Sequence, residues 1–459
     1  MAIGRQPEMF QHQQCHGAQC DGANRLSDVL IIGGGPAGST AAILLRHLGH
    51  QVTLLEKEHH PRFHIGESLL PANLPLFERL GVAKEISAIG MVKRGAEFVS
   101  PWHGRGETFE FSESWDCSQS YAYQVRRSDF DQILIRRAEH VGAEVIEGCC
   151  VQRVEFLAPG SGALIHATHD DGRSDSWRAR YVIDASGRDT LLSKQLHIKT
   201  RNSKHSSAAM FAHFLGATRG TDKHAGNISI FWFDHGWLWF IPLADGATSV
   251  GAVVWPYYLK RRSSTLQEFF LKTIELCPAL AGRLKDAKLS TVVRATGNYS
   301  YSSRYSHGDN YMLLGDAYTF IDPMFSSGVW LAMHSAVAGV EAVDVCLRAP
   351  QNSAAAFNKF DRDMRHGPET FSWFIYRITK PAMRDLFMNP NNRLRMKEAI
   401  LSVLSGDIFD KTPIWRSLRI FKIVYRIASL IDFRRSVAAV RLRRRNIRVE
   451  SLEQPAAVG

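Results

Sequence analysis

The chain has 459 residues, of which 45% are hydrophobic and 22% are charged, and its formal net charge is +11. A chain of this length and composition can bury a large core and can hold two or three domains. No window reaches the roughly 18 uninterrupted apolar residues of a transmembrane helix, and the polar N-terminus lacks the apolar segment of a secretory signal.

The first residues are expected to form a disordered extension over 1–26. The histidines and cysteines of this segment match no standard metal-site spacing, so we predict no metal there. The 7 cysteines of the whole chain are scattered along it, which is typical of reduced thiols and indicates a cytoplasmic protein. The N-terminal residues concerned are His12, Cys15, His16 and Cys20.

A dinucleotide-binding unit is predicted directly after this extension. Residues 28–32 form an apolar, β-branched run that is typical of a buried parallel strand, residues 39–46 have helical character, and residues 51–55 form a second strand. A GxGxxG motif joins the first strand to the helix, which is the order of a Rossmann βαβ unit. Its glycines are Gly33, Gly35 and Gly38.

The residues of this unit have separate physical roles. The glycines allow a tight turn, close approach of the backbone to a pyrophosphate and close packing of the helix, whose N-terminus then faces the phosphates. Glu56 ends the second strand at about the interval (~20 residues) expected of the acid that binds a ribose hydroxyl. A chance glycine-rich turn is the alternative, but strand, helix, strand and acid occur together in the required order, which favours dinucleotide binding.

Two later segments favour FAD over NAD. Each is a predicted strand that ends in an aspartate and a turn of small residues: Asp184 ends the first, and Asp316, after Gly315, ends the second. An aspartate at such a strand end can hydrogen-bond a ribityl chain, and the amides that follow can face a flavin. In this order the segments resemble the fold of the single-component FAD monooxygenases. Arg127 fits the flavin-side arginine of that family, and a surface arginine at a helix start is the alternative.

The sequence GWLWFIP over 236–242 contains the pattern WxWxIP. Trp237 and Trp239 occupy alternate positions of a predicted strand, so their rings project from one face. Such a pair can wall off a cavity, and beside a flavin this wall can separate a reactive oxygen species from an organic substrate. Packing in the core is the alternative role for both rings.

Three motifs together resemble those of the flavin-dependent halogenases: WxWxIP, the pattern FxxPxxSxG over 320–328, and GESLLP over 66–71. The resemblance runs from about Asp28 to at least Asp410. It implies an α/β, Rossmann-type FAD-binding fold of the flavin monooxygenase and halogenase type, with a β-sheet substrate domain and a helical C-terminal region. The expected units are an FAD-binding domain over 27–194 and 295–345, a substrate-side sheet over 195–294, a helical region over 346–410 and a basic amphipathic tail over 411–459.

The resemblance also implies the chemistry. Reduced FAD from a separate flavin reductase, oxygen, and chloride or bromide give hypohalous acid, which passes through a tunnel to a lysine. The lysine either forms a haloamine or holds the acid by a hydrogen bond, and an electron-rich aromatic ring then takes the halogen. Lys93 matches this lysine, and its flexible ammonium suits the role because its pKa shifts readily on burial. Since neighbours in a strand face opposite ways, only one of Lys93 and Arg94 can look inward.

The family pattern assigns further site residues. The halide is placed at the amides of Ser327 and Gly328, because successive N–H groups at a helix start can hold an anion, and an ordinary helix cap is compatible with this. Glu67 either shapes the tunnel or is a solvated loop acid. In the family, the residues matching Trp237 and Trp239 obstruct the approach of the substrate to the flavin, which suppresses hydroxylation.

One departure from the family narrows the substrate. Halogenases of free tryptophan carry a glutamate directly before the Ser-Thr-Gly stretch, and Phe325 stands at that place here. The chain therefore more closely resembles the branch that acts on phenols and pyrroles, several members of which take substrates tethered to acyl carrier proteins. A reductase like the geranylgeranyl reductases, an FAD-dependent aromatic hydroxylase and a non-catalytic, membrane-associated FAD scaffold remain alternatives.

The positive charge of the chain is concentrated in its tail, where residues 411–448 contain twelve lysines and arginines and one acid. Three alternatives remain for the helix predicted there: it caps the core with a solvated basic face, lies on an anionic membrane surface, or docks an acidic carrier protein. Nucleic acid is not expected, because the basic region is one C-terminal element on an enzyme body. The helical apolar positions are Trp415, Leu418, Phe421, Val424, Tyr425, Ala428 and Ile431, and the basic stripe is Arg416, Arg419, Lys422 and Arg426.

Overall fold

The computed structural model describes most of the chain, and its first strand begins at Leu26. The expected disordered extension and its candidate metal ligands lie outside the described residues, apart from Leu26 itself. Much of the basic tail also lies outside them. The described residues are 26–116, 118–158, 160–202, 207–297, 300–409, 412–435, 437–439 and 441.

An eight-stranded sheet carries the predicted dinucleotide motif. Its parallel part runs in the order β20, β10, β1, β2, β7. Strands β1 and β2 are rich in aliphatic residues and largely buried, as in a parallel sheet that helices cover. Their bounds are β1 Leu26–Ile32, β2 Val52–Leu55, β7 Glu144–Ile146, β10 Ser174–Asp184 and β20 Tyr311–Leu313; β8 Cys149–Phe156, β9 Ala163–His169 and β19 His307–Gly308 complete the sheet.

Three helices pack beside this sheet: α1 (Pro36–His47), α4 (Arg127–His140) and α9 (Gly328–Arg348). Helix α9 is long and apolar enough to cross a membrane, the one such helix within the described ranges. However, 56% of its most apolar window is buried, and it packs between α1 and α10, which accounts for its composition. The arrangement confirms the predicted Rossmann-type α/β fold.

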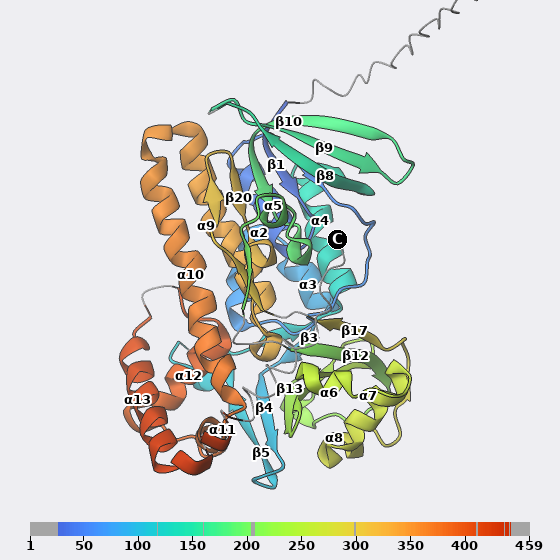
Figure 1. Ribbon diagram of the computed structural model, residues 1–459, viewed down its shortest axis with the longest axis vertical. Coiled ribbons are helices and arrows are strands. Elements are labelled where there is room, and N and C mark those ends of the chain that lie inside the picture. The colour runs from blue at the N-terminus through green and yellow to red at the C-terminus, as the bar shows by residue number, and fades with distance from the viewer. Residues whose placement is uncertain are drawn as a thin grey trace, which may run out of the picture.

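A second, mostly antiparallel sheet lies below the first in Figure 1. Its strand order is β16-β12-β15-β14-β13-β4-β5, with β17 also paired to β12. The bounds are β4 Gly95–Ser100, β5 Arg105–Glu110, β12 Ala208–Leu215, β13 Ile228–Phe233, β14 Gly236–Pro242, β15 Ala247–Val254, β16 Lys288–Leu289 and β17 Arg294–Gly297.

Strands β4 and β5 differ from the predicted domain division, because they fall within 27–194 yet extend the second sheet. Strand β4 pairs in parallel with β13, with Phe98 opposite Ile230. Phe98 is fully buried and its ring lies 5.2 Å from that of Phe387. The apolar face of the β4–β5 hairpin is therefore buried by partners far along the chain, which no local pattern could identify.

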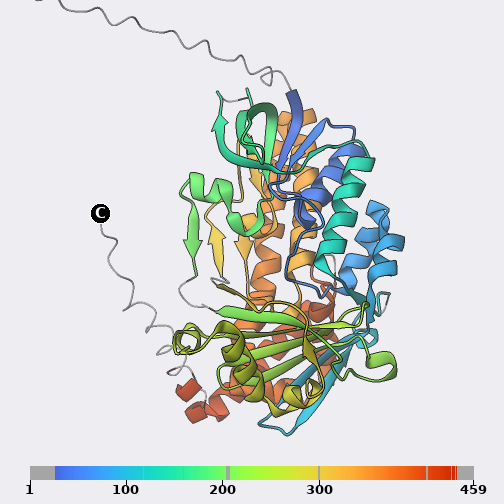
Figure 2. The same cartoon turned by 90° about the vertical axis from the view of Figure 1, so that its right-hand side faces the viewer.

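The two faces of the second sheet are covered by different helices (Figure 2). Alternation along β14 assigns Trp237 and Trp239 to one core and Leu238 and Phe240 to the other. The second of these cores also includes residues of α7 and α8, so the segment predicted as a sheet contains helices as well. These helices are α6 Pro256–Lys260, α7 Leu266–Glu275 and α8 Pro278–Arg283.

Helix α10 (Ser353–Ile378) connects the two halves of the molecule. Phe357 and Phe360, near its start, belong to the core of the FAD-side sheet, whereas Phe371 and Phe374 belong to the core that contains the two tryptophans. The remaining C-terminal helices cover the same tryptophan core (Figure 1). They are α11 Pro381–Met388, α12 Met396–Ser405 and α13 Trp415–Ile431.

Candidate active site

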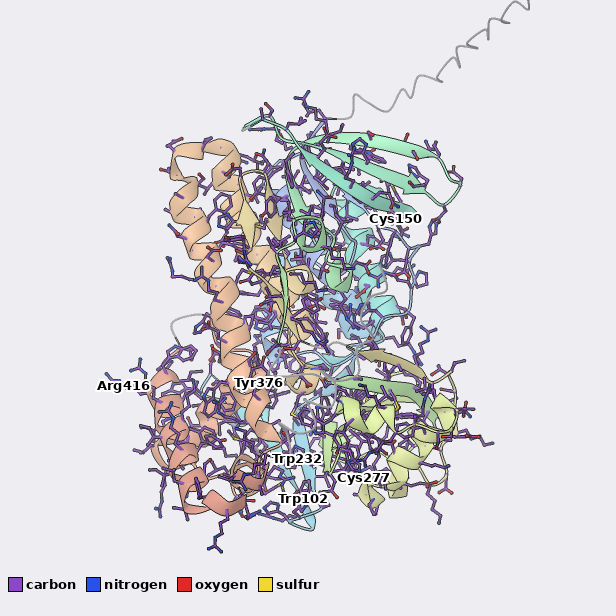
Figure 3. The ribbon with its side chains drawn as sticks, in the orientation of Figure 1. Trp102, Cys150, Trp232, Cys277, Tyr376 and Arg416 are labelled. Carbon is purple, nitrogen blue, oxygen red and sulfur yellow. The ribbon has the colours of Figure 1, made fainter. Side chains whose placement is uncertain are left out.

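A cavity with a volume of about 320 Å³ is lined from both halves of the molecule. Its walls come from the β1–α1 turn, residues 55–68, the turns after β10 and β20, strand β14 and the start of α9. Cys150, labelled in Figure 3, lines it from β8. The predicted site residues that line it are Gly33, Gly35, Glu56, Glu67, Arg127, Trp237, Trp239, Asp316 and Gly328.

The glycines of the first turn have the roles that the motif predicts. Gly33 has φ of 101°, and a Cβ atom on Gly38 would lie 1.9 Å from the Gly33 carbonyl oxygen, so this glycine is needed where helix α1 meets the turn. A Cβ on Gly35 would meet only the Arg62 guanidinium, at 3.6 Å. The α1 N-terminus at Gly35 is therefore open to the cavity, where its amides can bind a phosphate.

Glu56 is buried at the end of β2 and lines the cavity. Its Oε2 atom accepts a hydrogen bond of 2.6 Å from the Gly34 amide, and Oε1 accepts one of 2.9 Å from the Glu58 amide. These bonds fix the carboxylate beside the glycine turn, which is where a ribose hydroxyl has to be bound in a Rossmann unit.

Arg127 is a cavity residue and not a surface arginine. Its guanidinium donates to both carboxylate oxygens of Asp131, at 2.8 and 3.0 Å, and to the Ile65 carbonyl at 3.0 Å. Burial alone would raise the pKa of Asp131, but the positive Arg127 outweighs it and holds that pKa below its usual range. Arg127 is thus held rigidly at the cavity wall, and it also begins helix α4.

The two strand-end aspartates have different surroundings, since only one of them lines the cavity. Asp316 lines the cavity, and burial raises its pKa to about 6, although Arg188 and Arg127 oppose the shift. The sequence also predicted that Asp184 can hydrogen-bond a ribityl chain. Its carboxylate instead accepts from the Ser186 and Leu192 amides, at 2.9 and 2.8 Å, and it does not line the cavity. A buried carboxylate at a strand end can accept hydrogen bonds from the first amides of the next helix, and it then does not bind a ligand.

Two predicted glycines have different surroundings. Gly315 does not line this cavity. It adopts φ of 54°, and an added Cβ would lie 3.1 Å from the side chain of Ala332, so it permits the turn that presents Asp316. At Gly328, by contrast, an added Cβ would meet nothing within 4 Å. The cavity is open at that point.

Sequence reasoning missed four basic cavity residues: Lys57, Arg62, His64 and Arg188. Arg62 lies 3.3 Å from the Asp131 carboxylate. Burial, together with the positive Arg127, lowers the pKa of His64 to about 4, so its ring is neutral at physiological pH. These residues belong to irregular segments without periodicity. The only signal that could have found them is their position beside the GESLLP and strand-end motifs.

Lys93 is buried, whereas its neighbour Arg94 is exposed. Lys93 ends strand β3 (Met91–Lys93), which pairs with β6 (Ala122–Gln124). Its ammonium donates to the Ser68 hydroxyl and to the Leu69 carbonyl, both at 3.0 Å, and lies 5.2 Å from the centre of the Phe111 ring. Burial lowers the pKa of Lys93 to about 7. Lys93 does not itself line the cavity, but Ser68 does.

Glu67 is not a solvated loop acid, since its side chain is 2% exposed and lines the cavity. Its Oε1 atom lies 2.8 Å from Nε2 of His213, which is equally buried on strand β12. The Oε2 atom of Glu67 and the Nδ1 atom of His213 have no hydrogen-bond partner among the described residues. No sequence signal identified His213, because 146 residues separate the two partners.

Trp237 and Trp239 serve both as cavity wall and as core, so the two alternatives for these residues are compatible. Their ring centres are 6.0 Å apart, and the Trp239 indole donates to the Ser249 hydroxyl at 3.1 Å. A Cβ atom on Gly251 of the adjacent strand would lie 2.2 Å from the Trp239 ring. The ring can occupy its position only because residue 251 has no side chain.

The predicted halide site lies at the start of α9. Ser327 is the N-cap residue and is 1% exposed, and its hydroxyl has no hydrogen-bond partner among the described residues. The first amides of a helix have no intrahelical acceptor and carry partial positive charge, which favours an anion. Phe325 points elsewhere, since it packs in the tryptophan core with its ring 6.4 Å from that of Phe374.

The cavity therefore fits FAD on its own geometry: a glycine turn at a helix start, a ribose-side acid, an aspartate at the second strand end and open space at Gly328. The chain matches the family model of the FAD binding domain over residues 26–349. Known halogenases are similar over most of its length.

It is 35% identical to a tryptophan 2-halogenase of Chondromyces crocatus over 399 residues, which cover 82% of this chain and 75% of that protein. It is 30% identical to a 1H-pyrrole-2-carbonyl-[peptidyl-carrier protein] chlorinase of Pseudomonas fluorescens, over 83% of this chain and 89% of that protein. The crystal structure of the myxobacterial chondrochloren halogenase CndH superposes with a TM-score of 0.74 at 31% identity, covering 88% of this chain and 97% of that one. The chain is an FAD-dependent oxidoreductase and belongs to the flavin-dependent halogenases.

Proposed function

We propose that this halogenase passes the halogen to its substrate by way of Lys93, and that the substrate is an electron-rich phenol or pyrrole. The proposal rests chiefly on the position of Lys93. Its ammonium is 3.0 Å from Ser68, and Ser68 lines the same cavity as Trp237 and Trp239. A hydrogen bond to Ser68 thus links the lysine to a residue of the cavity wall.

Bound FADH2, supplied by a separate flavin reductase, gives two electrons that reduce one atom of O2 to water and leave the other in hypohalous acid, with one halide and one proton consumed. The protein provides the place for the halide at the Ser327 and Gly328 amides. The Trp237 and Trp239 rings fill the wall next to it, which keeps a bulky aromatic substrate on the far side. A reductase is proposed because the sequence has a single Rossmann motif.

Lys93 can act in two ways, and its pKa of about 7 leaves both protonation forms available at neutral pH. As a free amine it attacks the halogen of hypohalous acid: an N–X bond forms, the O–X bond breaks, and the hydroxide leaves with the amine proton as water. As an ammonium it donates a hydrogen bond to the hypohalous acid. In the first case the ring forms the C–X bond as the N–X bond breaks, and the ring proton returns to the amine. In the second case the O–X bond breaks, and the hydroxide leaves with the ring proton as water.

The substrate class is supported by Phe325, which replaces a carboxylate with a phenyl ring. Without a carboxylate there, the ring has to be activated by its own oxygen or nitrogen, as in phenols and pyrroles. The similarity to a chlorinase of a carrier-bound pyrrole supports a carrier-tethered substrate for this enzyme as well.

The indole of tryptophan is a second candidate, favoured by the similarity to a tryptophan 2-halogenase. Carbon 2 of indole belongs to the pyrrole part of the ring system and is activated by the ring nitrogen. This candidate is therefore compatible with Phe325.

The test is an assay of the purified protein with FAD, a flavin reductase, NADH, oxygen and halide. Phenols, pyrroles and indoles are offered free and as carrier thioesters, and mass spectrometry detects halogenated products. We expect a halide-dependent product from a pyrrole or phenol in the wild type. Oxygenated products without halogen would instead indicate a hydroxylase, and halogenation of indoles alone would replace the phenol and pyrrole assignment.

A further inference from the structure

Helix α13 has apolar side chains on two faces, and the part of the chain that the structure describes covers only one. The inner face contributes Leu418, Phe421 and Tyr425 to the tryptophan core, where each is at most 7% exposed. The sequence pattern predicted these three residues on one face, but it also placed Ile431 there, which is wrong because Ile431 is exposed. The outer face and the turn beyond it expose aliphatic and aromatic side chains: Ile423 at 53%, Ile427 at 51%, Leu430 at 69%, Ile431 at 82% and Phe433 at 61%.

Arginines border this outer apolar face. Arg416, Arg419 and Arg426 are exposed, and no carboxylate among the described residues forms an ion pair with any of them. Arg416 projects away from the body of the molecule in Figure 3. The sole acid on the helix or at its end is Asp432, which pairs with Arg435. The outer face thus combines a cluster of exposed apolar groups with uncompensated positive charge.

We infer that the outer face of α13 rests on an anionic lipid surface, so that the enzyme is a peripheral membrane protein. An amphipathic helix with aliphatic residues on one side and arginines beside them binds a membrane interface by burying the former among acyl chains and pairing the latter with anionic headgroups. Contiguous exposed apolar groups of this kind mark a contact site, whereas scattered ones do not.

Two other occupants fit less well. A carrier protein has to present its substrate at the cavity, but the cavity lining ends at Ala332 and includes no residue of α10 to α13. A second copy of the chain would have to pair this face with itself, and a two-fold contact would bring Arg419 and Arg426 of both copies together without acids to neutralise them.

The experiment is co-sedimentation of the full-length protein with vesicles of phosphatidylcholine, with and without a minority of phosphatidylglycerol. We expect binding only when phosphatidylglycerol is present. Replacing three outer residues together, Ile423→Ser, Ile427→Ser and Leu430→Ser, is expected to weaken binding about a hundredfold, because each half-exposed aliphatic group contributes roughly a factor of five. Arg419→Gln with Arg426→Gln is expected to weaken it about thirtyfold.

A matched control changes exposed apolar residues elsewhere. Leu276 and Val292 are 53% and 78% exposed near the helices of the second sheet, and Leu276→Ser with Val292→Ser is expected to leave vesicle binding unchanged. FAD content and halogenation of a soluble substrate should be the same in all variants, which separates this inference from the proposed reaction.

Three results would overturn the inference. One is wild-type protein that stays in solution with anionic vesicles, and another is a triple serine variant that sediments as well as the wild type. The third is a dimer, detected by light scattering, that the triple variant dissociates while vesicle binding is absent. That result would assign the face to a second copy.

Discussion

The ammonium of Lys93 lies 3.0 Å from the hydroxyl of Ser68, and of these two residues only Ser68 reaches the cavity wall. The lysine is therefore close to the cavity yet shielded from it. Its environment is dry, which keeps its pKa near 7. A lysine in this state is present as both amine and ammonium at neutral pH, whereas an exposed lysine is almost entirely protonated.

Replacing Lys93 separates the two stages of the proposed reaction. We expect Lys93→Ala to abolish ring halogenation while hypohalous acid still forms, because the residues that line the cavity are unchanged. The measurement is mass spectrometry of the product together with a chemical trap for hypohalous acid. Arg94→Ala is the matched control, since Arg94 is the exposed neighbour and should retain full activity. Loss of the trapped acid in Lys93→Ala would show that the lysine acts earlier.

The pH dependence of the rate distinguishes the two forms of Lys93. If the free amine carries the halogen, the single-turnover rate of ring halogenation rises as the pH increases through about 7. If the ammonium holds the hypohalous acid, this rate falls over the same pH range. The rate of FAD reoxidation is measured in parallel as the control. A ring-halogenation rate that is flat from well below to well above this pH contradicts both roles.

Burial of Lys93 also makes a prediction for stability. The folded-state pKa of Lys93, about 7, is below the ordinary value of 10.5. Between these pH values the unfolded chain therefore binds more protons than the folded protein. The destabilising contribution of the lysine to the free energy of unfolding thus decreases as the pH rises. Lys93→Met should therefore raise the melting temperature most below pH 7 and least near pH 10.5. The free-energy gain is about 1.4 kcal/mol for each unit of pKa shift that burial causes. A gain that grows with pH would contradict this.

Burial of Asp316 is predicted to lower the stability of the FAD-free protein, although the same carboxylate is expected to bind FAD. Its pKa of about 6 exceeds the unfolded value of 3.8, so its ionised form destabilises the fold increasingly as the pH rises through this window. We expect Asp316→Asn to stabilise the FAD-free protein above pH 6 by at most about 3 kcal/mol, and water in the cavity reduces this gain by screening the charge. We also expect the substitution to weaken FAD binding. Urea unfolding of the apoprotein and fluorescence titration with FAD measure the two effects. Destabilisation of the apoprotein would show that the ionised carboxylate has a stabilising partner.

His213 is expected to act by holding Glu67. His213→Phe leaves the buried Oε1 atom of Glu67 without its partner, which should lower the free energy of unfolding by about 1–3 kcal/mol. His213→Gln keeps a donor and should lose less. The comparison is made by urea unfolding, with halogenation measured as kcat and KM separately. Equal stability of the two variants would mean that the hydrogen bond contributes nothing.

Gly251 is expected to control the position of the Trp239 ring. Gly251→Ala places a Cβ atom 2.2 Å from that ring, so the indole has to move, at a cost of about 1–3 kcal/mol. Displacing the ring opens the wall, and we expect more oxygenated product relative to halogenated product. Adding Trp239→Phe to Gly251→Ala should restore stability but not the product ratio. Unchanged product in both variants would show that Trp239 is only a core residue.

The sequence predicted the parts of the site that are local. The glycine turn, Glu56 and the tryptophan pair depend on spacing within a short segment, and the structure places each of them at the cavity. Arg127 was also found, through its match to the flavin-side arginine of the family. The family and the cofactor could be predicted because three such motifs occur together.

The parts that were missed depend on contacts between distant segments. His213 is buried by a partner in another part of the chain, and the role of Asp184 is decided by the Ser186 and Leu192 amides and not by its own motif. The outer face of α13 was missed because the helical spacing of the apolar residues was assigned to a single face, and only the burial of each residue shows that Ile423, Ile427 and Leu430 form a second, exposed one.

The parallel pairing of β4 with β13 determines how this enzyme can be recombined with its relatives. Strand β4 is encoded between two segments of the FAD-binding sheet. It pairs with β5 on one side, but on the other side its partner is a strand more than a hundred residues later. A chimera that exchanged only residues 195–294 would pair a foreign β13 with the native β4 and bury mismatched side chains around Phe98. The smallest exchangeable unit therefore includes residues 95–110, and a library of substrate-domain swaps should be cut at those positions as well.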